Sequence, residues 1–197
     1  MLNIGVLISG GGTNLQAIID ETKSGGINGT VKLVISNKED AYGLERARLS
    51  GIKAVYETDE DKIIGLLKEN NIDLIVLAGY LKIITPKFVD EFRNKIINIH
   101  PSLIPSFCGK GYYGEKVHQG VIDYGAKVTG ATVHFVDEGA DTGAIIMQET
   151  VNVEQDDDAK SLAKRVLEVE HRILKESIRL FCENKLSIQG RRVFINE

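Results

Sequence analysis

The first half of the chain alternates short apolar runs rich in β-branched residues with segments of helical periodicity. The runs Asn3–Ser9 and Val31–Ser36 have the length of buried strands, and the stretch between them reads as a helix after a glycine turn. Strands that alternate with helices pair in parallel, because each helix carries the chain back to the start of the next strand. The sequence therefore predicts an α/β fold with a mostly parallel central sheet flanked by helices.

The same pattern places the other elements. Strands are expected at Asn3–Ser9, Val31–Ser36, Lys53–Tyr56, Asp73–Ala78 and Ile96–Ile99, and helices at Asn14–Glu21, Gly43–Leu49, Glu60–Asn70 and Pro86–Arg93. Later in the chain we expect a helix at Val117–Asp123, two long strands at Ala126–Asp137 and Ala144–Val153, a long helix at Ser161–Asn184, and a hairpin of Leu186–Ile188 with Arg192–Ile195. Because no repeat or linker interrupts the pattern, we expect one domain over residues 1–197.

Composition narrows the class of partner. Apolar residues make up 43% of the chain and charged residues 26%, and the net charge is −4, so neither nucleic acid nor an anionic membrane is an expected partner. The apolar runs are too short to span a bilayer, and no signal peptide is visible. The cysteines, Cys108 and Cys182, are expected to be free thiols of a cytoplasmic protein. A small anionic substrate would then need a local positive site.

A glycine turn, Ser9–Asn14, separates the first expected strand from the first helix. Backbone N–H groups at the start of a helix are unpaired and favour an anion, and glycine lets the backbone approach it closely. Thr13 and Asn14 would add side-chain donors. The segment matches neither a dinucleotide fingerprint nor a P-loop. We expect it to bind a phosphate, although a plain tight turn between strand and helix is the alternative.

Asn98 and His100 stand two residues apart at the end of the fifth expected strand, so both side chains point to one side. An amide donor beside a histidine suits stabilisation of an oxyanion and proton transfer, while the alternative is a strand end with a structural histidine. Asp141 lies in a loop with the chemistry of an ordinary turn. If the Asp141 carboxylate met His100, it would orient the imidazole ring and raise the pKa of His100 above the model value of about 6.5. The histidines lack metal-ligand spacing, so no metal is expected.

These segments together resemble the folate-dependent formyltransferases. The resemblance rests on Ser9-Gly-Gly-Gly-Thr-Asn-Leu-Gln16, Asn98-Ile-His-Pro-Ser102, Thr132-Val-His134 and Asp141-Thr-Gly143, whose order and spacing cover nearly the whole chain. The glycine turn followed by Thr-Asn-Leu-Gln is similar to the branch that acts on glycinamide ribonucleotide. The resemblance implies a Rossmann-like fold and transfer of the formyl group of 10-formyltetrahydrofolate to the amine of that nucleotide, in de novo purine synthesis.

The resemblance also implies roles for individual residues. Asn98, His100 and Asp141 would be the catalytic trio, with Thr132 and His134 as supporting residues. The nucleotide would be bound by Gly11, Gly12, Thr13, Asn14 and Glu170. The folate would be bound by Leu81, Lys82, Ile83, Ile84, Asn98, Asp137, Gly139, Ala140 and Asp141. The N-terminal half would thus be the phosphate side and the C-terminal half the folate side. The bond Ile104–Pro105 is expected to be cis, and the protein a monomer or homodimer.

Other readings remain within the same superfamily. A transformylase of initiator tRNA would be expected to carry an extra basic domain after the long helix, and a formyltetrahydrofolate deformylase a regulatory domain before the first strand. A relative that has lost catalysis and only binds folate is a third alternative, and the intact trio speaks against it.

Overall fold

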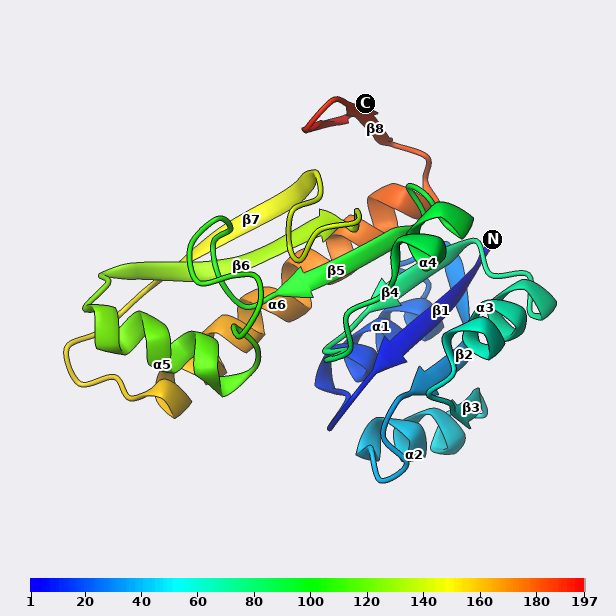
Figure 1. Ribbon diagram of the computed structural model, residues 1–197, viewed down its shortest axis with the longest axis horizontal. Helices are drawn as coiled ribbons and strands as arrows, with labels where there is room; N and C mark the ends of the chain where they lie inside the picture. Colours follow the sequence, from blue (N-terminus) through cyan, green and yellow to red (C-terminus); the bar gives the residue numbers. More distant parts are fainter. Residues whose placement is uncertain (197) are drawn as a thin grey trace.

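The computed structural model describes residues 1–196 and folds them into three layers around one sheet (Figure 1). Its strands are β1 (Leu2–Ile8), β2 (Gly29–Ser36), β3 (Lys53–Tyr56), β4 (Leu74–Leu77), β5 (Ile96–His100), β6 (Val128–Phe135), β7 (Ile145–Asn152), β8 (Leu186–Gln189) and β9 (Arg192–Ile195). Its helices are α1 (Thr13–Ser24), α2 (Tyr42–Leu49), α3 (Glu60–Glu69), α4 (Pro86–Glu91), α5 (Glu115–Tyr124) and α6 (Ala159–Cys182).

Within the described residues the strands form one nine-stranded sheet in the order β3-β2-β1-β4-β5-β6-β7-β9-β8. The pairs from β3 to β5 are all parallel, whereas β6 runs antiparallel to both β5 and β7. The expected α/β fold with a mostly parallel sheet is therefore confirmed. The direction of pairing changes at β5, which is parallel to β4 on one side and antiparallel to β6 on the other.

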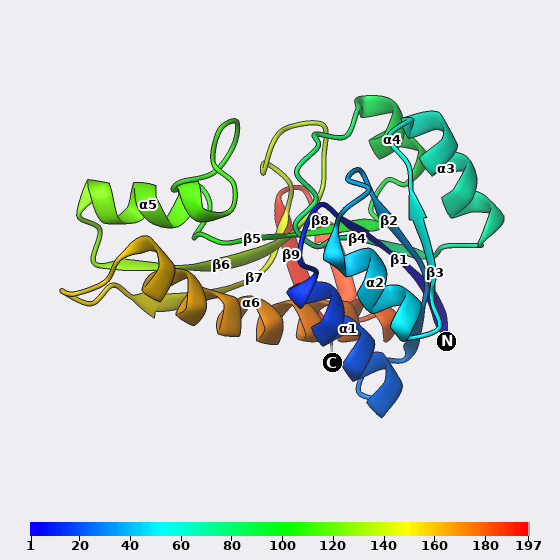
Figure 2. The same cartoon turned by 90° about the horizontal axis from the view of Figure 1, so that it is seen from below.

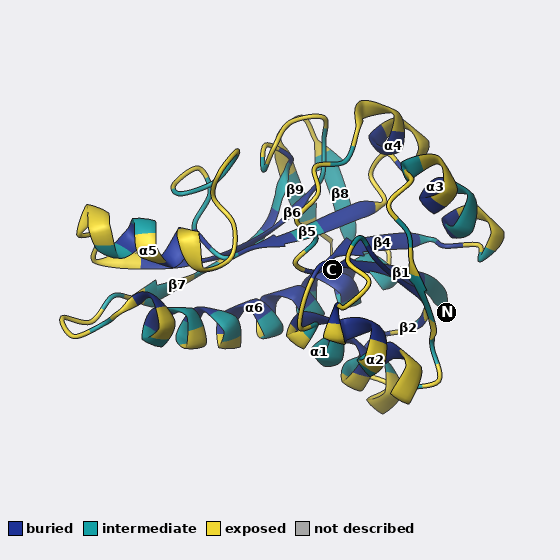
Figure 3. Cartoon of the chain, turned by 60° about the horizontal axis from the view of Figure 1, so that its bottom comes forward, coloured by how far each residue is buried: buried dark blue, intermediate teal, exposed yellow. Residues whose placement is uncertain are grey.

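Helices cover both faces of the sheet (Figure 2). One apolar cluster joins β1 to α1, α2 and α6, and includes Ile18, Leu44 and Leu174, which are fully or almost fully buried. A second cluster on the opposite face joins the sheet to α3 and α4 around Ile63 and Phe88. Burying both faces explains why the central strand β4 is apolar throughout and does not alternate. In Figure 3 the strands are mostly buried, while the loops at their ends stay exposed.

The long helix α6 begins two residues earlier than expected. Asp158 accepts a hydrogen bond from the backbone N–H of Ser161, and the Ser161 hydroxyl accepts one from the backbone N–H of Asp158. This reciprocal pairing satisfies two otherwise unpaired donors and fixes the start of the helix. The two long antiparallel strands are each shorter than expected. The Ile104–Pro105 bond is cis, as the resemblance implied.

Candidate active site

A cavity of about 610 Å³ opens where β1, β4 and β5 end. The glycine turn lines one end, the segments 81–84 and 137–141 line the other, and α6 contributes Leu167 and Glu170. Parallel sheets place ligands in this position, at the carboxyl ends of their strands. Every residue expected to contact substrate or folate lines this one cavity. Thr132 does not, because it is fully buried beneath it.

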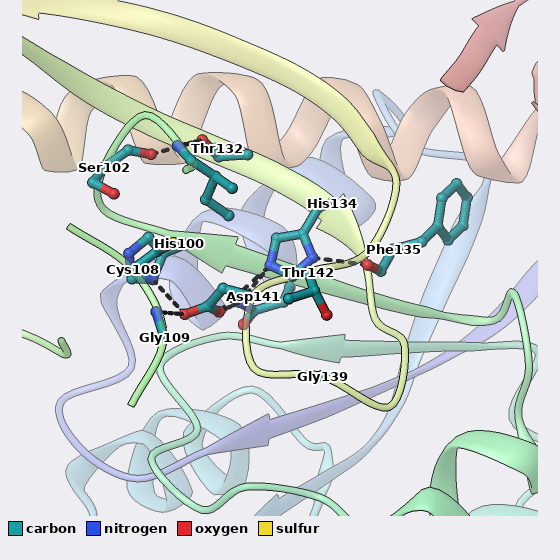
Figure 4. A network of polar contacts seen from close by, with 12 residues as sticks. His100, Ser102, Cys108, Gly109, Thr132, His134, Phe135, Gly139, Asp141 and Thr142 are labelled. Atoms are coloured by element: carbon teal, nitrogen blue, oxygen red, sulfur yellow. Dashed lines mark hydrogen bonds and ion pairs between the residues drawn. The ribbon is translucent and has the colours of Figure 1, made fainter. Parts of the chain in front are cut away.

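Three elements bring the catalytic candidates together (Figure 4). Asn98 and His100 come from β5, His134 from β6, and Asp141 from the loop between β6 and β7. His100 Nδ1 lies 3.6 Å from Asp141 Oδ2, and His134 Nε2 lies 3.7 Å from Asp141 Oδ1. The register of β6 against β7 shifts between Val133 and His134. Such a shift re-aims a side chain beside a site. The sheet thus sets one carboxylate between two imidazoles.

The hydrogen bonds of His100 fix which ring nitrogen carries its proton. Nε2 lies 2.9 Å from the carbonyl oxygen of Phe107, which can only accept, so Nε2 is the donor. When the ring is neutral, Nδ1 therefore presents a lone pair to Asp141. This nitrogen can take up a proton, and the carboxylate beside it would stabilise the imidazolium that forms.

The same reasoning orients Asn98. His134 Nδ1 lies 2.7 Å from the carbonyl oxygen of Phe135, so His134 Nε2 is an acceptor in the neutral ring. The amide nitrogen of Asn98 lies 3.1 Å from this Nε2 and donates to it. Its other hydrogen points to Asp141 Oδ1 at 3.4 Å, which is the weaker contact. His134 therefore aims the Asn98 amide toward the cavity.

Burial decides the pKa of His100. Only 5% of the residue is exposed, and the loss of solvent lowers the pKa below its model value of 6.5. Asp141 and the Phe107 carbonyl oppose this shift without overcoming it. The expectation of a raised pKa is therefore wrong. His100 is neutral at pH 7 and poised to accept a proton.

Asp141 is held ionised. Burial alone would raise the pKa of its carboxyl group, but His134 and His100, when they carry a proton on the facing nitrogen, and the backbone N–H of Gly109 hold it below its usual range. That N–H donates to Asp141 Oδ2 at 2.9 Å. Asp141 also adopts a left-handed backbone conformation, with φ of 58°. Such geometry costs free energy and gathers at functional sites.

The opposite end of the cavity is made of backbone. Gly12 precedes α1 with φ of 72°, and no side chain caps the first N–H groups of this helix. Arg46 donates through Nε to the carbonyl oxygen of Gly11 at 2.7 Å and braces the turn from behind. The Asn14 amide donates to Glu170 at 2.8 Å. Burial raises the pKa of Glu170 to about 7, so a carboxyl group near half-ionisation lies beside the turn.

The expected folate segments differ in character. Leu81 and Ile83 are apolar side chains exposed at the cavity, and the backbone N–H of Leu81 is fixed by the Ser9 hydroxyl at 2.8 Å. In the facing loop, Asp137 accepts from the Gly139 N–H at 3.1 Å and the Thr142 hydroxyl at 2.5 Å. The loop is thus held by its own side chain, which leaves other backbone groups to face the cavity. The roles of these residues stay predictions.

Comparison with known proteins supplies the family. The model of the formyl transferase family matches residues 2–178. A phosphoribosylglycinamide formyltransferase of Haemophilus influenzae is 43% identical over all of this chain and 94% of its own length. A chloroplastic phosphoribosylglycinamide formyltransferase of Vigna unguiculata is 41% identical over 93% of this chain. The chain spans 62% of the length of that relative. A solved glycinamide ribonucleotide transformylase 1 of Symbiobacterium toebii is 45% identical, with a TM-score of 0.94 over 100% of this chain and 95% of that one.

The chain belongs to the formyl transferase family. This membership confirms the resemblance found from the sequence motifs, and it accords with the sheet and its long C-terminal helix. A chloroplastic relative from Arabidopsis thaliana is likewise longer, and the chain spans 66% of it.

In this formyl transferase, backbone groups position the side chains of the site, which the sequence motifs did not indicate. The Phe107 carbonyl fixes the His100 tautomer, and the Gly109 N–H holds Asp141. Beneath them, the Thr132 hydroxyl donates to the Ser102 carbonyl at 2.6 Å and accepts from the Ile104 N–H at 3.1 Å. Every residue type carries these backbone groups, so no sequence motif could have indicated them.

Among residues 1–196, no group of three or more His, Cys, Asp or Glu side chains is placed to hold a metal ion. In the same part of the chain, no helix is long and apolar enough to cross a membrane. The carboxylate and the two histidines of this site lie against one another; the histidines also pair with backbone carbonyls and the carboxylate with the Gly109 N–H.

Proposed function

We propose that this formyl transferase moves the formyl group of 10-formyltetrahydrofolate to the amine of glycinamide ribonucleotide, in purine biosynthesis. The observation that carries the proposal is the position of Asp141 between His100 and His134, 3.6 and 3.7 Å away, in the wall of a cavity that also holds the glycine turn. A proton relay and an anion site thus share one space of about 610 Å³, a volume typical of small-molecule sites. The names of the relatives at 41–45% identity support the same substrate.

The nucleotide phosphate would bind at the start of α1, on the backbone of Gly11, Gly12, Thr13 and Asn14. The uncapped N–H groups and the helix dipole favour an anion there. Glu170 would accept from a sugar hydroxyl or from the amine of the substrate, since it already accepts from Asn14. This end supplies binding rather than chemistry.

The folate would bind at the other end. A pterin is flat with amide-like edges, so it suits an apolar wall opposite exposed backbone. Leu81, Ile83 and Ile84 provide the wall, with Lys82 at its rim. The loop of Asp137, Gly139, Ala140 and Asp141 would provide the hydrogen bonds to the edge of the ring system.

In the reaction, the substrate amine attacks the formyl carbon, and negative charge develops on the formyl oxygen. The Asn98 amide would donate to that oxygen. Its contact to Asp141, at 3.4 Å, is the weaker of its two and is the one that the formyl oxygen would replace. The stronger contact to His134 keeps the amide aimed, so the donor is oriented before charge appears.

The proton released by the amine would move to His100 Nδ1, directly or through one water. Asp141 stabilises the imidazolium so formed, and His100 then returns the proton to N10 of the folate as the bond from the formyl carbon to N10 breaks. One carbon–nitrogen bond forms, one breaks, and one proton changes place. Assistance of this kind is worth about 10²–10⁴-fold in rate.

We also propose that residues 1–197 act as one cytoplasmic domain on small-molecule substrates. The test is an assay in which the folate absorbance is followed on mixing protein, 10-formylfolate and glycinamide ribonucleotide. Turnover that needs the nucleotide, without release of free formate in its absence, supports the proposal. Formate release without the amine would indicate a deformylase, and binding without turnover a non-catalytic relative; either result contradicts it.

A further inference from the structure

The phosphate end of the cavity is short of positive charge. A phosphate monoester carries about −1.5 to −2 at pH 7, while a helix start offers the equivalent of about +0.5. The glycine turn itself is neutral, and α6 contributes only Leu167 and Glu170 to the lining. The guanidinium of Arg46 is engaged behind the turn, with the carbonyl of Gly11 and the side chain of Gln16. A lysine from another part of the cavity would balance the remaining charge.

Among the described residues that line the cavity, the lysines are Lys82 and Lys110, and no arginine accompanies them. Lys82 belongs to the apolar wall at the far end, and its ammonium donates to the carbonyl oxygen of Thr58 at 2.7 Å. Within residues 1–196, Lys110 makes no ion pair and no side-chain hydrogen bond. It is the lysine of the cavity whose charge is uncommitted.

Lys110 lies in the segment of residues 109–114, which lines the cavity that also holds the glycine turn. Tyr113, three residues on, lines the same cavity, and its hydroxyl is 2.9 Å from the ammonium of Lys116. The pKa of Tyr113 is lowered by this hydrogen bond and, to a smaller degree, by the charge of Lys38. Lys38 follows β2, and the next helix, α2, is bonded to the glycine turn through the Gly43 N–H and the Gly10 carbonyl, at 3.0 Å. Residues 109–114 line the same cavity as residues 9–14 and as Asn98, His100 and Asp141, so the segment forms a wall that the glycine turn and the proposed catalytic trio share.

Glycines in the left-handed region shape the backbone of residues 109–114. Gly109, Gly111 and Gly114 have φ of 82°, 97° and 53°, conformations that glycine adopts without strain. Lys110 stands between two of them and is exposed. Its side chain is therefore open to solvent in the cavity that the start of α1 also lines.

The same segment holds the catalytic groups. The Phe107 carbonyl accepts from His100, and the Gly109 N–H donates to Asp141, both at 2.9 Å. Figure 4 shows Gly109 beside the Asp141 carboxylate. Lys110 is the next residue along the chain. A contact made by Lys110 thus acts on a backbone that sets the geometry of His100 and Asp141.

We propose that Lys110 binds the phosphate of the nucleotide substrate, and that this contact positions His100 and Asp141 through residues 107–109. This inference rests on the proposed function. It makes the phosphate a contributor to turnover as well as to affinity, because binding energy from a remote group is then used at the reacting centre.

The test is a cycle of protein and substrate changes. Wild type and Lys110→Met are assayed with glycinamide ribonucleotide and with its dephosphorylated riboside. With the nucleotide, Lys110→Met should lose about 10- to 100-fold in kcat/KM, the range of one charge-assisted hydrogen bond, and kcat should fall along with the rise in KM. With the riboside, the two proteins should be equal. Lys110→Arg should restore most of the activity, and Lys32→Met, which removes an equal charge from an exposed site on β2, is the control.

Equal losses of Lys110→Met with both substrates, or no loss with either, would overturn the phosphate contact. A loss confined to KM would overturn the link to the trio. Binding of ribose 5-phosphate, measured by calorimetry, separates this inference from the proposed function. Weaker binding by Lys110→Met supports the contact even if glycinamide ribonucleotide proves not to be the substrate, and unchanged binding refutes it.

Discussion

The two ends of the cavity differ in the groups that line them: backbone N–H groups at one end and converging side chains at the other. The end proposed to bind phosphate, the phosphate end, is one continuous segment, Gly10–Asn14, which offers uncapped backbone N–H groups. The end proposed to carry the chemistry, the catalytic end, gathers side chains from β5, β6 and the loop after β6, with backbone groups of residues 107–109. A local backbone site depends on a few conformations, whereas a site of converging side chains depends on the packing of the whole sheet. We therefore expect substitutions at the first end to affect binding and those at the second to affect chemistry.

The largest effect is expected for Asp141→Asn. This change removes the charge and keeps the shape, so kcat should fall by about 10²–10⁴-fold while both KM values stay within a few-fold. Steady-state kinetics at pH 7 measure both constants. If KM for the nucleotide rises and kcat is unaffected, the division between the two ends is wrong.

The same variant tests the link to His100. Asp141 raises the pKa of His100 against the stronger effect of burial, so Asp141→Asn should lower that pKa further. NMR of the His100 ring across pH in both proteins follows the change. An identical pKa in the two would mean that Asp141 does not act through His100.

A smaller effect, on stability, is expected from the one buried carboxyl group near the glycine turn. The pKa of Glu170 is raised from 4.5 to about 7, so the folded state holds a proton that the unfolded state has lost. Stability should then fall as pH rises from about 4.5, and level off above about 7. Relative to wild type, Glu170→Gln should gain on the order of 3 kcal/mol across this window.

Urea unfolding at several pH values measures the difference, with Glu168→Gln on the exposed side of the same helix as control. A difference that does not grow between pH 4.5 and 7 would mean that Glu170 is ionised in the folded protein over this whole range.

A third effect, of about 1–3 kcal/mol in stability, is expected for Gly12→Ala. Gly12 has a positive φ, and an added Cβ would lie 2.7 Å from the Cα of Gly43. KM for the nucleotide should rise while kcat changes little. Gly10→Ala is the matched control for stability, because a Cβ there meets nothing within 4 Å. Equal stability losses in the two variants would show that the turn tolerates no side chain at any position.

The parallel half of the fold was predictable because its rule is local. Apolar runs of strand length followed by amphipathic helices admit few arrangements, and β3 was predicted residue for residue. The antiparallel half was placed less well. The expected strand Ala126–Asp137 is observed as Val128–Phe135, because its pairing with β5 ends where Phe135 meets Ile97. The final hairpin joins the sheet through the single pair of Ile145 with Arg192, which no local pattern specifies.

The candidate site was predictable by two different routes. The glycine turn follows from the physics of glycine and helix starts. The pairing of His100 with Asp141, 41 residues apart in the chain, came from family resemblance and not from spacing. The direction of the His100 pKa shift was mispredicted, because the burial that lowers this pKa depends on tertiary packing around the ring, which sequence spacing does not specify. The bonds to Phe107 and Gly109 involve backbone atoms, which every residue type shares.

The smallest effect is expected for a change at Ser102, whose hydroxyl contacts the backbone that holds His100. Ser102 is fully buried, and its hydroxyl donates to the carbonyl of Ser106 at 2.6 Å, with the carbonyl of Phe107 3.2 Å away. Ser102→Ala leaves the Ser106 carbonyl without this partner, at a cost of about 1 kcal/mol in stability. Because the Phe107 carbonyl then holds His100 less firmly, kcat should also fall a few-fold at unchanged KM. Unfolding and steady-state kinetics on one preparation measure both.

Ser177 on α6 is the matched control for this last prediction. It is also fully buried, but its hydroxyl has no hydrogen-bond partner within residues 1–196. Ser177→Ala removes an unpaired polar group from the core, so stability should stay equal or rise, and kcat should not change. If the two serine variants behave alike, the hydroxyl of Ser102 fills space and does not position the His100 partner. If only Ser102→Ala loses turnover, the catalytic end depends on packing beneath the strand end, as the contrast between the two ends requires.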